Sequence, residues 1–230
     1  MIRDFQSFIG ALMDAGFSGA VGGKDDGVFA LFRYGWGAEV ESGVVWHTGD
    51  PDTDPWEWRV RVLNERDDIA YAKLFFRKAG YITKEWYPFF LAARRGGMTF
   101  EEAYAGGVLS HAARRVYEVF DAGSRLPVQD MKRRAGFSRA DAAKFDSALS
   151  ELQMRMYLTM CGAEQRRSRT GEEYGWQSTV FCKPETFWPC EVFERAAGLT
   201  AEAATRVIAE QVMRLNPAAN PKKLVRFISG

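Results

Sequence analysis

The most constraining feature of the sequence is a change in hydrophobic spacing within residues 109–183. From Leu109 to Gln153 apolar side chains recur every three or four positions, which is typical of amphipathic helices. Beyond this stretch the spacing drops to two, which is typical of a half-buried strand. The alternating apolar residues are Met154, Met156, Leu158 and Met160. We therefore expect three helices followed by strands.

Local signals place the three helices. Ala112–Phe120 carries an apolar stripe and forms the first helix. Pro127 suits the first turn of the second helix, and Gly136 suits its C-terminal end. Ser138 is expected to cap the third helix, because its hydroxyl can accept hydrogen bonds from free amide groups. On that helix Phe145, Leu149 and Leu152 share one face.

Two strands complete the pattern. Met154–Cys161 is expected to pair with Trp176–Lys183, with three arginines near the tip of the hairpin. Three helices followed by a β-hairpin is the order of a winged helix, in which the hairpin is the wing. The predicted fold class is α+β and mainly helical: a winged helix preceded by an N-terminal α+β region.

The remaining chain divides around Gly96-Gly97. We expect an N-terminal α+β region at 1–97, the winged-helix domain at 98–183 and a C-terminal helical region at 184–230, packed on the rest. The elements expected in the first region are helices at Asp4–Ala15, from Pro55 and at Trp86–Ala93, a short strand at Val28–Phe32, and a hairpin with its turn at Arg77–Gly80. Thr99 and Glu102 form a capping box. Thr200 and Pro221 open the last two helices, of which the second should dock through Leu224, Val225 and Ile228.

Composition excludes several classes of protein. The net charge is +1, and basic residues exceed acidic ones only after residue 95, by 19 to 16. No segment has the uninterrupted apolar length of a membrane span. The early acidic residues Asp4 and Asp14 argue against a secretory signal, so we expect a cytoplasmic protein with no membrane partner. Three widely spaced cysteines and two histidines predict buried thiols, no metal site and no cofactor.

One functional hypothesis is binding to double-stranded DNA. A helix in the major groove needs small polar or basic side chains on its outer face, and a wing meets phosphates through arginine or lysine. The candidate DNA-binding residues are Lys132, Arg133, Arg134, Arg139, Lys144, Arg166, Arg167 and Arg169. The alternative is that these are solvated surface charges on a winged helix that contacts protein.

A second hypothesis is an enzyme centred on residues 46–59, WHTGDPDTDPWEWR. His47 beside Asp50, Asp52 or Asp54 would form an oriented base. Trp46, Trp56 and Trp58 would form an aromatic platform for an extruded base. The competing interpretation is structural: tryptophans in a core, Asp-Pro pairs as turn and cap, and a structural histidine. Catalysis is therefore left open.

A third hypothesis is an interaction module without chemistry. Exposed aromatic residues such as Trp86 or Trp188 would then anchor a protein partner.

The sequence resembles a known family. The segments LSHAARRVYEVF, LPVQDMKRRAGF, FDSALSELQMRMYLTMCG and GWQSTVF, with DFQSFIGALMDAGF and WHTGDPDTDPWEWR, resemble the AlkZ-related proteins, winged-helix relatives of AlkZ-type DNA glycosylases. The resemblance implies a winged-helix fold, duplex DNA as the partner and a place in DNA repair. The family's glycosylases remove alkylated bases and are characterised by a Gln-x-Gln or Gln-x-Asp motif.

This chain departs from that motif. None of its glutamines has glutamine or aspartate two positions later; they are Gln6, Gln129, Gln153, Gln165, Gln177 and Gln211. The resemblance therefore implies the fold and the partner, and it assigns no catalytic residue.

Overall fold

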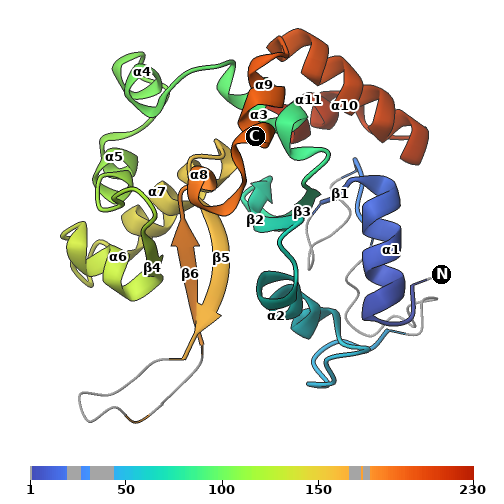
Figure 1. Ribbon diagram of the computed structural model, residues 1–230, viewed down its shortest axis with the longest axis horizontal. Helices are drawn as coiled ribbons and strands as arrows, with labels where there is room; N and C mark the ends of the chain where they lie inside the picture. Colours follow the sequence, from blue (N-terminus) through green and yellow to red (C-terminus); the bar gives the residue numbers. More distant parts are fainter. Residues whose placement is uncertain (1, 20–26, 32–43, 166–171, 173–176) are drawn as a thin grey trace.

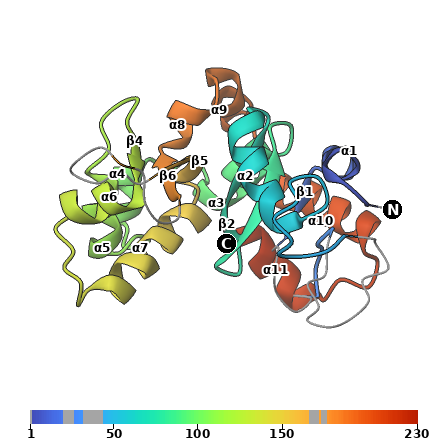
Figure 2. The ribbon, with the colours of Figure 1, turned by 90° about the horizontal axis from the view of Figure 1, so that it is seen from below.

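The computed structural model describes residues 2–19, 27–31, 44–165, 172 and 177–230. Within them the protein is α+β, with six strands in one antiparallel sheet and helices gathered at both ends of that sheet (Figures 1 and 2). No helix in this part of the chain is long and apolar enough to cross a membrane.

The N-terminal elements follow the expected order, except that the short strand Phe17–Ser18 was not predicted. They are α1 (Phe5–Ala15), β1 (Phe17–Ser18), α2 (Pro55–Glu65), β2 (Ile69–Phe75), β3 (Lys78–Thr83) and α3 (Tyr87–Arg95). The predicted cap at Asp54 is confirmed, because Asp54 accepts from the Trp56 amide. Asp4, expected as the first residue of its helix, instead caps α1 by accepting from the Ser7 amide. The predicted strand at Val28–Phe32 is wrong for residues 28–31, which form no strand, and Phe32 lies outside the described residues.

The β2–β3 hairpin turns earlier than predicted. Phe76 and Arg77 both have positive φ, at 51° and 61°, as a two-residue turn between twisted strands requires. Lys78–Gly80 therefore belongs to β3 instead of the turn. Gly80 also lets β1 approach, because a Cβ atom there would lie 2.7 Å from the Ser18 carbonyl oxygen.

In the middle of the chain, the residues that the structure describes form four helices and three strands. They are α4 (Phe100–Ala105), α5 (His111–Tyr117), β4 (Arg125–Pro127), α6 (Val128–Arg134), α7 (Ala142–Met154), β5 (Thr159–Glu164) and β6 (Ser178–Cys182). The capping box of Thr99 and Glu102 is confirmed. Strand β4 was not predicted, and it places Pro127 at the end of a strand, as the residue that precedes α6.

Helix α7 begins later than predicted. Ser138 does not cap it; instead the Asp141 carboxylate accepts hydrogen bonds from the Ser138 amide and hydroxyl, at 3.1 and 2.5 Å. The helix starts only at Ala142, with Asp141 as its N-cap residue.

The predicted strand from Met154 is also wrong in its first half. Met154 ends α7, and Met156 lies in the left-handed region with φ 61°. Residues 156–159 are all buried, so the alternation that suggested a half-buried strand does not correspond to an inside and an outside face. The burial does not follow the alternation either, because Met156 belongs to one cluster and its neighbours Tyr157 and Leu158 both belong to another.

Four helices end the chain. They are α8 (Pro184–Phe187), α9 (Cys190–Ala197), α10 (Ala201–Leu215) and α11 (Pro221–Ser229). The Thr200 cap and the proline start of α11 are confirmed. The predicted docking of α11 is confirmed for Leu224 and Ile228, which pack in the core, and wrong for Val225, which is 68% exposed; Phe227 is also buried.

The sheet links the two ends of the molecule. Its strand order is β1-β3-β2-β5-β6-β4, and β2 meets β5 through the pair Tyr71 and Met160. Cys161 and Cys182 are free buried thiols on β5 and β6, as predicted, and Cys190 is exposed.

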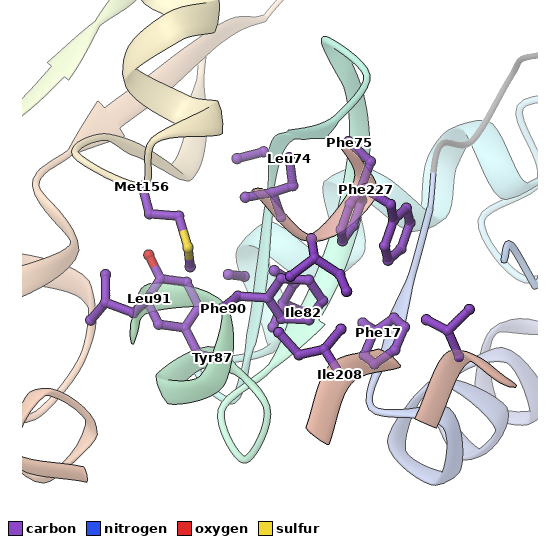
Figure 3. Close-up of a cluster of buried hydrophobic side chains, with 14 of the residues drawn as sticks. Phe17, Leu74, Phe75, Ile82, Tyr87, Phe90, Leu91, Met156, Ile208 and Phe227 are labelled. Atoms are coloured by element: carbon purple, nitrogen blue, oxygen red, sulfur yellow. The ribbon is translucent and has the colours of Figure 1, made fainter. Parts of the chain in front are cut away.

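Three hydrophobic clusters pack around this sheet. One lies between β2, β3, α3 and the C-terminal helices, where Phe75 stacks on Phe227 with ring centroids 4.1 Å apart (Figure 3). A second fills the space among α4–α7, β5 and β6. The third joins α1 and α2 to β2 and β3 and includes Trp58.

Candidate nucleic-acid interface

The predicted basic residues lie around the connection between α6 and α7. Lys132, Arg133 and Arg134 form the last turn of α6, Arg139 lies in the connection, and Lys144 is on α7. All are exposed except Lys132, which is half-buried. Arg166, Arg167 and Arg169 lie outside the described residues.

Arg115 holds this connection in place, a role that the sequence did not reveal. Its Nη2 donates to the carbonyl oxygens of Ala135 and Gly136, at 2.7 and 2.9 Å. Its guanidinium also lies over the Phe137 ring at 4.2 Å. Gly136 has φ 68°, a conformation that glycine adopts without strain. The Arg115 side chain, which projects from α5, therefore fixes the path of the chain between α6 and α7.

The two halves of helix α7 differ in their exposure to solvent. In its C-terminal half Ser150 and Gln153 are covered by β2: Lys73 Nζ donates to Ser150 Oγ, and the Lys73 amide donates to Gln153 Oε1. In its N-terminal half Ala143, Lys144, Asp146 and Ser147 are exposed. Only that half remains open to a partner.

The β2–β3 turn adds a cation to the same exposed half. Arg77 Nη2 donates to Ser147 Oγ at 2.7 Å, across 70 residues of sequence. No local pattern indicates this neighbour, so Arg77 was missed as a candidate.

Carboxylates reduce the positive charge of the surface. Asp130 pairs with Arg133 at 3.0 Å. Hydrogen bonds from the Ser138 hydroxyl and amide lower the pKa of Asp141, which keeps it ionised. Asp146 is exposed on α7. Six cations, including Arg77, thus face three carboxylates, and the surface is basic on balance.

In the 46–59 segment, Asp54 is a structural cap. It is fully buried, and its two carboxylate oxygens accept from the amides of Trp56 and Gly49, at 2.8 and 3.0 Å. Its position before Pro55 fixes the start of α2. This carboxylate is therefore occupied by backbone donors and sealed from solvent.

The other two aspartates are exposed and engaged. Asp50 accepts from the Thr53 hydroxyl at 2.7 Å and from the Asp52 amide, and these bonds lower its pKa. Asp52 pairs with Arg61 at 2.8 Å, and its carbonyl accepts from Trp58 Nε1. Asp50 thus fixes the loop internally, and Asp52 holds the loop against α2.

The three tryptophans are not brought together as a platform. Trp58 is fully buried and stacks on Phe8, with ring centroids 5.2 Å apart, so it presents no face to a ligand. Trp56 is 41% exposed, but the Arg59 guanidinium lies 3.9 Å over its ring. Exposed His47 lies 5.2 Å from the Trp56 ring and 6.3 Å from that of Trp46.

The cap assignment makes a prediction for Asp54. Asp54→Ala should lower the free energy of unfolding by about 2 kcal/mol, because two buried amides lose their acceptor. Asp54→Asn keeps one acceptor oxygen and should cost about 1 kcal/mol. Denaturant unfolding measures both. Asp52→Ala, which removes an exposed ion pair, is the control and should cost less than about 1 kcal/mol. Equal stability of wild type and Asp54→Ala would contradict the cap assignment.

Within the described part of the chain, no group of three or more histidine, cysteine, aspartate or glutamate side chains is placed to hold a metal ion.

These observations define an α+β protein with a basic surface around a helix pair and an adjoining hairpin. The chain belongs to the AlkZ-related family, whose model matches residues 2–229. No curated protein and no solved structure matches the chain significantly.

Proposed function

We propose that residues 98–183 form a winged-helix unit that binds duplex DNA, with α7 as its recognition helix. The order α5–β4–α6–α7–β5–β6, with β4 and β5 both paired to β6, supports this arrangement. In this proposal residues 1–97 and 184–230 are regions packed against the unit. Membership of the AlkZ-related family supports DNA as the partner.

The exposed N-terminal half of α7 carries the proposal. In helix-turn-helix proteins the first residues of the recognition helix contact base edges in the major groove. Here that half is the part left uncovered by β2, and Lys144 and Ser147 lie on it. Arg139 precedes it, and Lys132, Arg133 and Arg134 end the helix before it. In this proposal, these side chains contact phosphates on either side of the groove.

The β5–β6 hairpin is the proposed wing. It extends from the sheet beyond α6 and α7 (Figure 1). Arg166, Arg167 and Arg169 lie in sequence between its two strands, where a wing carries phosphate-binding side chains. Arg77, which lies outside residues 98–183, adds a further basic side chain beside Ser147 of α7.

Catalysis at the 46–59 segment has weaker support. Asp54 is sealed as a cap, Trp58 is in the core, and the chain lacks the glutamine motif of the glycosylases. A repair role would instead consist of recognising damaged DNA. Tighter binding to a duplex with an abasic-site analogue than to an undamaged one would support that role.

The test is a set of charge variants in fluorescence anisotropy with a short labelled duplex. The triple change Arg134→Gln, Arg139→Gln and Lys144→Gln should weaken binding 10-fold or more and reduce the salt dependence of log K by about 3, since each phosphate contact contributes about 0.9. Changing Arg166, Arg167 and Arg169 to Gln should have a similar effect.

The control is Arg206→Gln on α10, an exposed arginine outside this surface. It should leave both affinity and slope unchanged. If the triple variant binds DNA as the wild type does, α7 is not the DNA-binding element. If neither the wild type nor any variant binds DNA at low salt, the basic surface around α6 and α7 serves a protein partner.

A further inference from the structure

Helix α11 presents a basic face to solvent. Its apolar side packs in the core, so Lys222, Val225 and Arg226 lie on the outer side and are exposed. Within the described part of the chain, neither Lys222 nor Arg226 forms a salt bridge. Residues 211–230 contain no acidic side chain. A face of this kind favours a polyanionic partner.

The β2–β3 turn connects this face to α7. The Arg226 guanidinium lies over the ring of Phe76, 5.8 Å from its centroid, and the neighbouring Arg77 donates to Ser147 Oγ of α7. Lys144 lies one turn before Ser147 on the same exposed half of α7. Figure 2 shows α7, the end of β2 and α11 next to one another. A row of basic side chains therefore runs from α7 across the turn to α11.

Arg94 fixes the two helices relative to each other. Its guanidinium donates to the carbonyl oxygens of Met154 in α7 and of Phe227 and Ile228 in α11. The Arg94 side chain is buried, so solvent does not compete for these hydrogen bonds. Because α7 and α11 are held rigidly, a partner that contacts both of them pays little ordering entropy.

We propose that α11 is a second DNA-contacting element, and that one duplex lies across α7, the β2–β3 turn and α11 with phosphates at Lys222 and Arg226. This inference rests on the proposed function and extends the DNA-binding surface beyond residues 98–183. Regularly spaced phosphates can meet the cations of all three elements at once. Lys223 is left out of this contact set, because its Nζ lies beside Gly27.

The first test removes two cations from the face and follows binding of a labelled duplex by fluorescence anisotropy over a range of salt concentrations. Lys222→Gln combined with Arg226→Gln should weaken binding about 5-fold or more and reduce the salt dependence of log K by about 2, since each phosphate contact contributes about 0.9. The matched control combines Arg195→Gln on α9 with Arg206→Gln on α10, which removes the same charge from exposed arginines elsewhere. It should keep the wild-type slope.

The second test adds a cation to the same face. Val225 is 68% exposed and lies beside Lys222 and Arg226 on the helix. Val225→Lys should therefore tighten binding about twofold or more and steepen the slope by about 1. Val225→Gln is the matched control and should bind as the wild type does. A misfolded variant loses affinity, so tighter binding reports on the surface itself.

The outcomes separate this inference from the proposed function. If the α7 triple variant loses affinity while the α11 pair keeps the wild-type slope, α11 is not a DNA contact and the winged-helix proposal stands. The same holds if Val225→Lys binds no tighter than Val225→Gln, or if the Arg195 and Arg206 pair loses as much slope as the α11 pair. A loss in the α11 pair alone would contradict one duplex lying across both helices. Absent binding by the wild type at low salt would overturn both proposals.

Discussion

Arg94→Met is expected to lower the free energy of unfolding by about 4 kcal/mol, because it orphans three buried carbonyl groups at once. The Arg94 side chain is 4% exposed and donates to the carbonyl oxygens of Met154, Phe227 and Ile228, at 2.9, 3.0 and 2.9 Å. These carbonyls lie in the last turns of α7 and α11, where no helical partner is left for them. One guanidinium thus joins α3 to the ends of two helices.

Arg94 itself is buried at a cost. Burial lowers its pKa to about 9, so it stays protonated at neutral pH. Lysine cannot replace its three-way geometry, and Arg94→Lys should still lose about 2–3 kcal/mol. Denaturant unfolding gives these values, and thermal unfolding should show a fall in Tm of roughly 10 °C for Arg94→Met. Arg206→Met, an exposed arginine on α10, is the control and should cost less than about 0.5 kcal/mol. Similar stabilities of the two variants would contradict this role.

Trp58→Ala is expected to cost about 4 kcal/mol, because a fully buried indole leaves a cavity that its neighbours cannot fill. Its ring stacks on Phe8 and touches Phe5, which ties α2 to α1. Its Nε1 also donates to the Asp52 carbonyl at 3.0 Å. Trp58→Phe keeps an aromatic contact and should lose about half as much.

The matched control is Trp56→Ala, two positions away. Trp56 is 41% exposed, so its removal should cost less than about 1 kcal/mol. Denaturant unfolding of the three variants separates a core tryptophan from a surface one. A larger loss at Trp56 than at Trp58 would overturn the assignment of Trp58 to the core.

Sequence reasoning succeeded where the physical cause was local. Asp54, Thr99 and Thr200 cap their helices as predicted, because a cap depends on a side chain and an amide two or three residues away. The same reasoning failed at Ser138. There the Ser138 hydroxyl donates to the Asp141 carboxylate instead of accepting from a helix amide, and the sequence pattern was compatible with either hydrogen bond.

Non-local contacts were beyond the sequence. Arg94 meets Ile228 across 134 residues and Arg77 meets Ser147 across 70, and no periodicity records such pairs. Strand β4 has three residues and ends in a proline, so it carries no strand pattern of its own. The stretch after Met154 was misread because its residues are buried on both sides. In the candidate site, the sequence named Lys132, Arg133, Arg134, Arg139 and Lys144 as candidates, but it revealed neither Arg77 nor the covering of half of α7 by β2.

The most direct test of the central claim is the salt dependence of wild-type binding to a short undamaged duplex, measured by fluorescence anisotropy. With the five described basic residues around α6 and α7 and the three wing arginines at phosphates, log K should fall against log salt with a slope of about −7, or roughly 10⁴ in affinity between about 50 and 200 mM. A parallel titration with an abasic-site analogue tests the repair role. Absent binding at low salt, or binding that salt does not weaken, would contradict the proposal that this protein holds duplex DNA through α6 and α7.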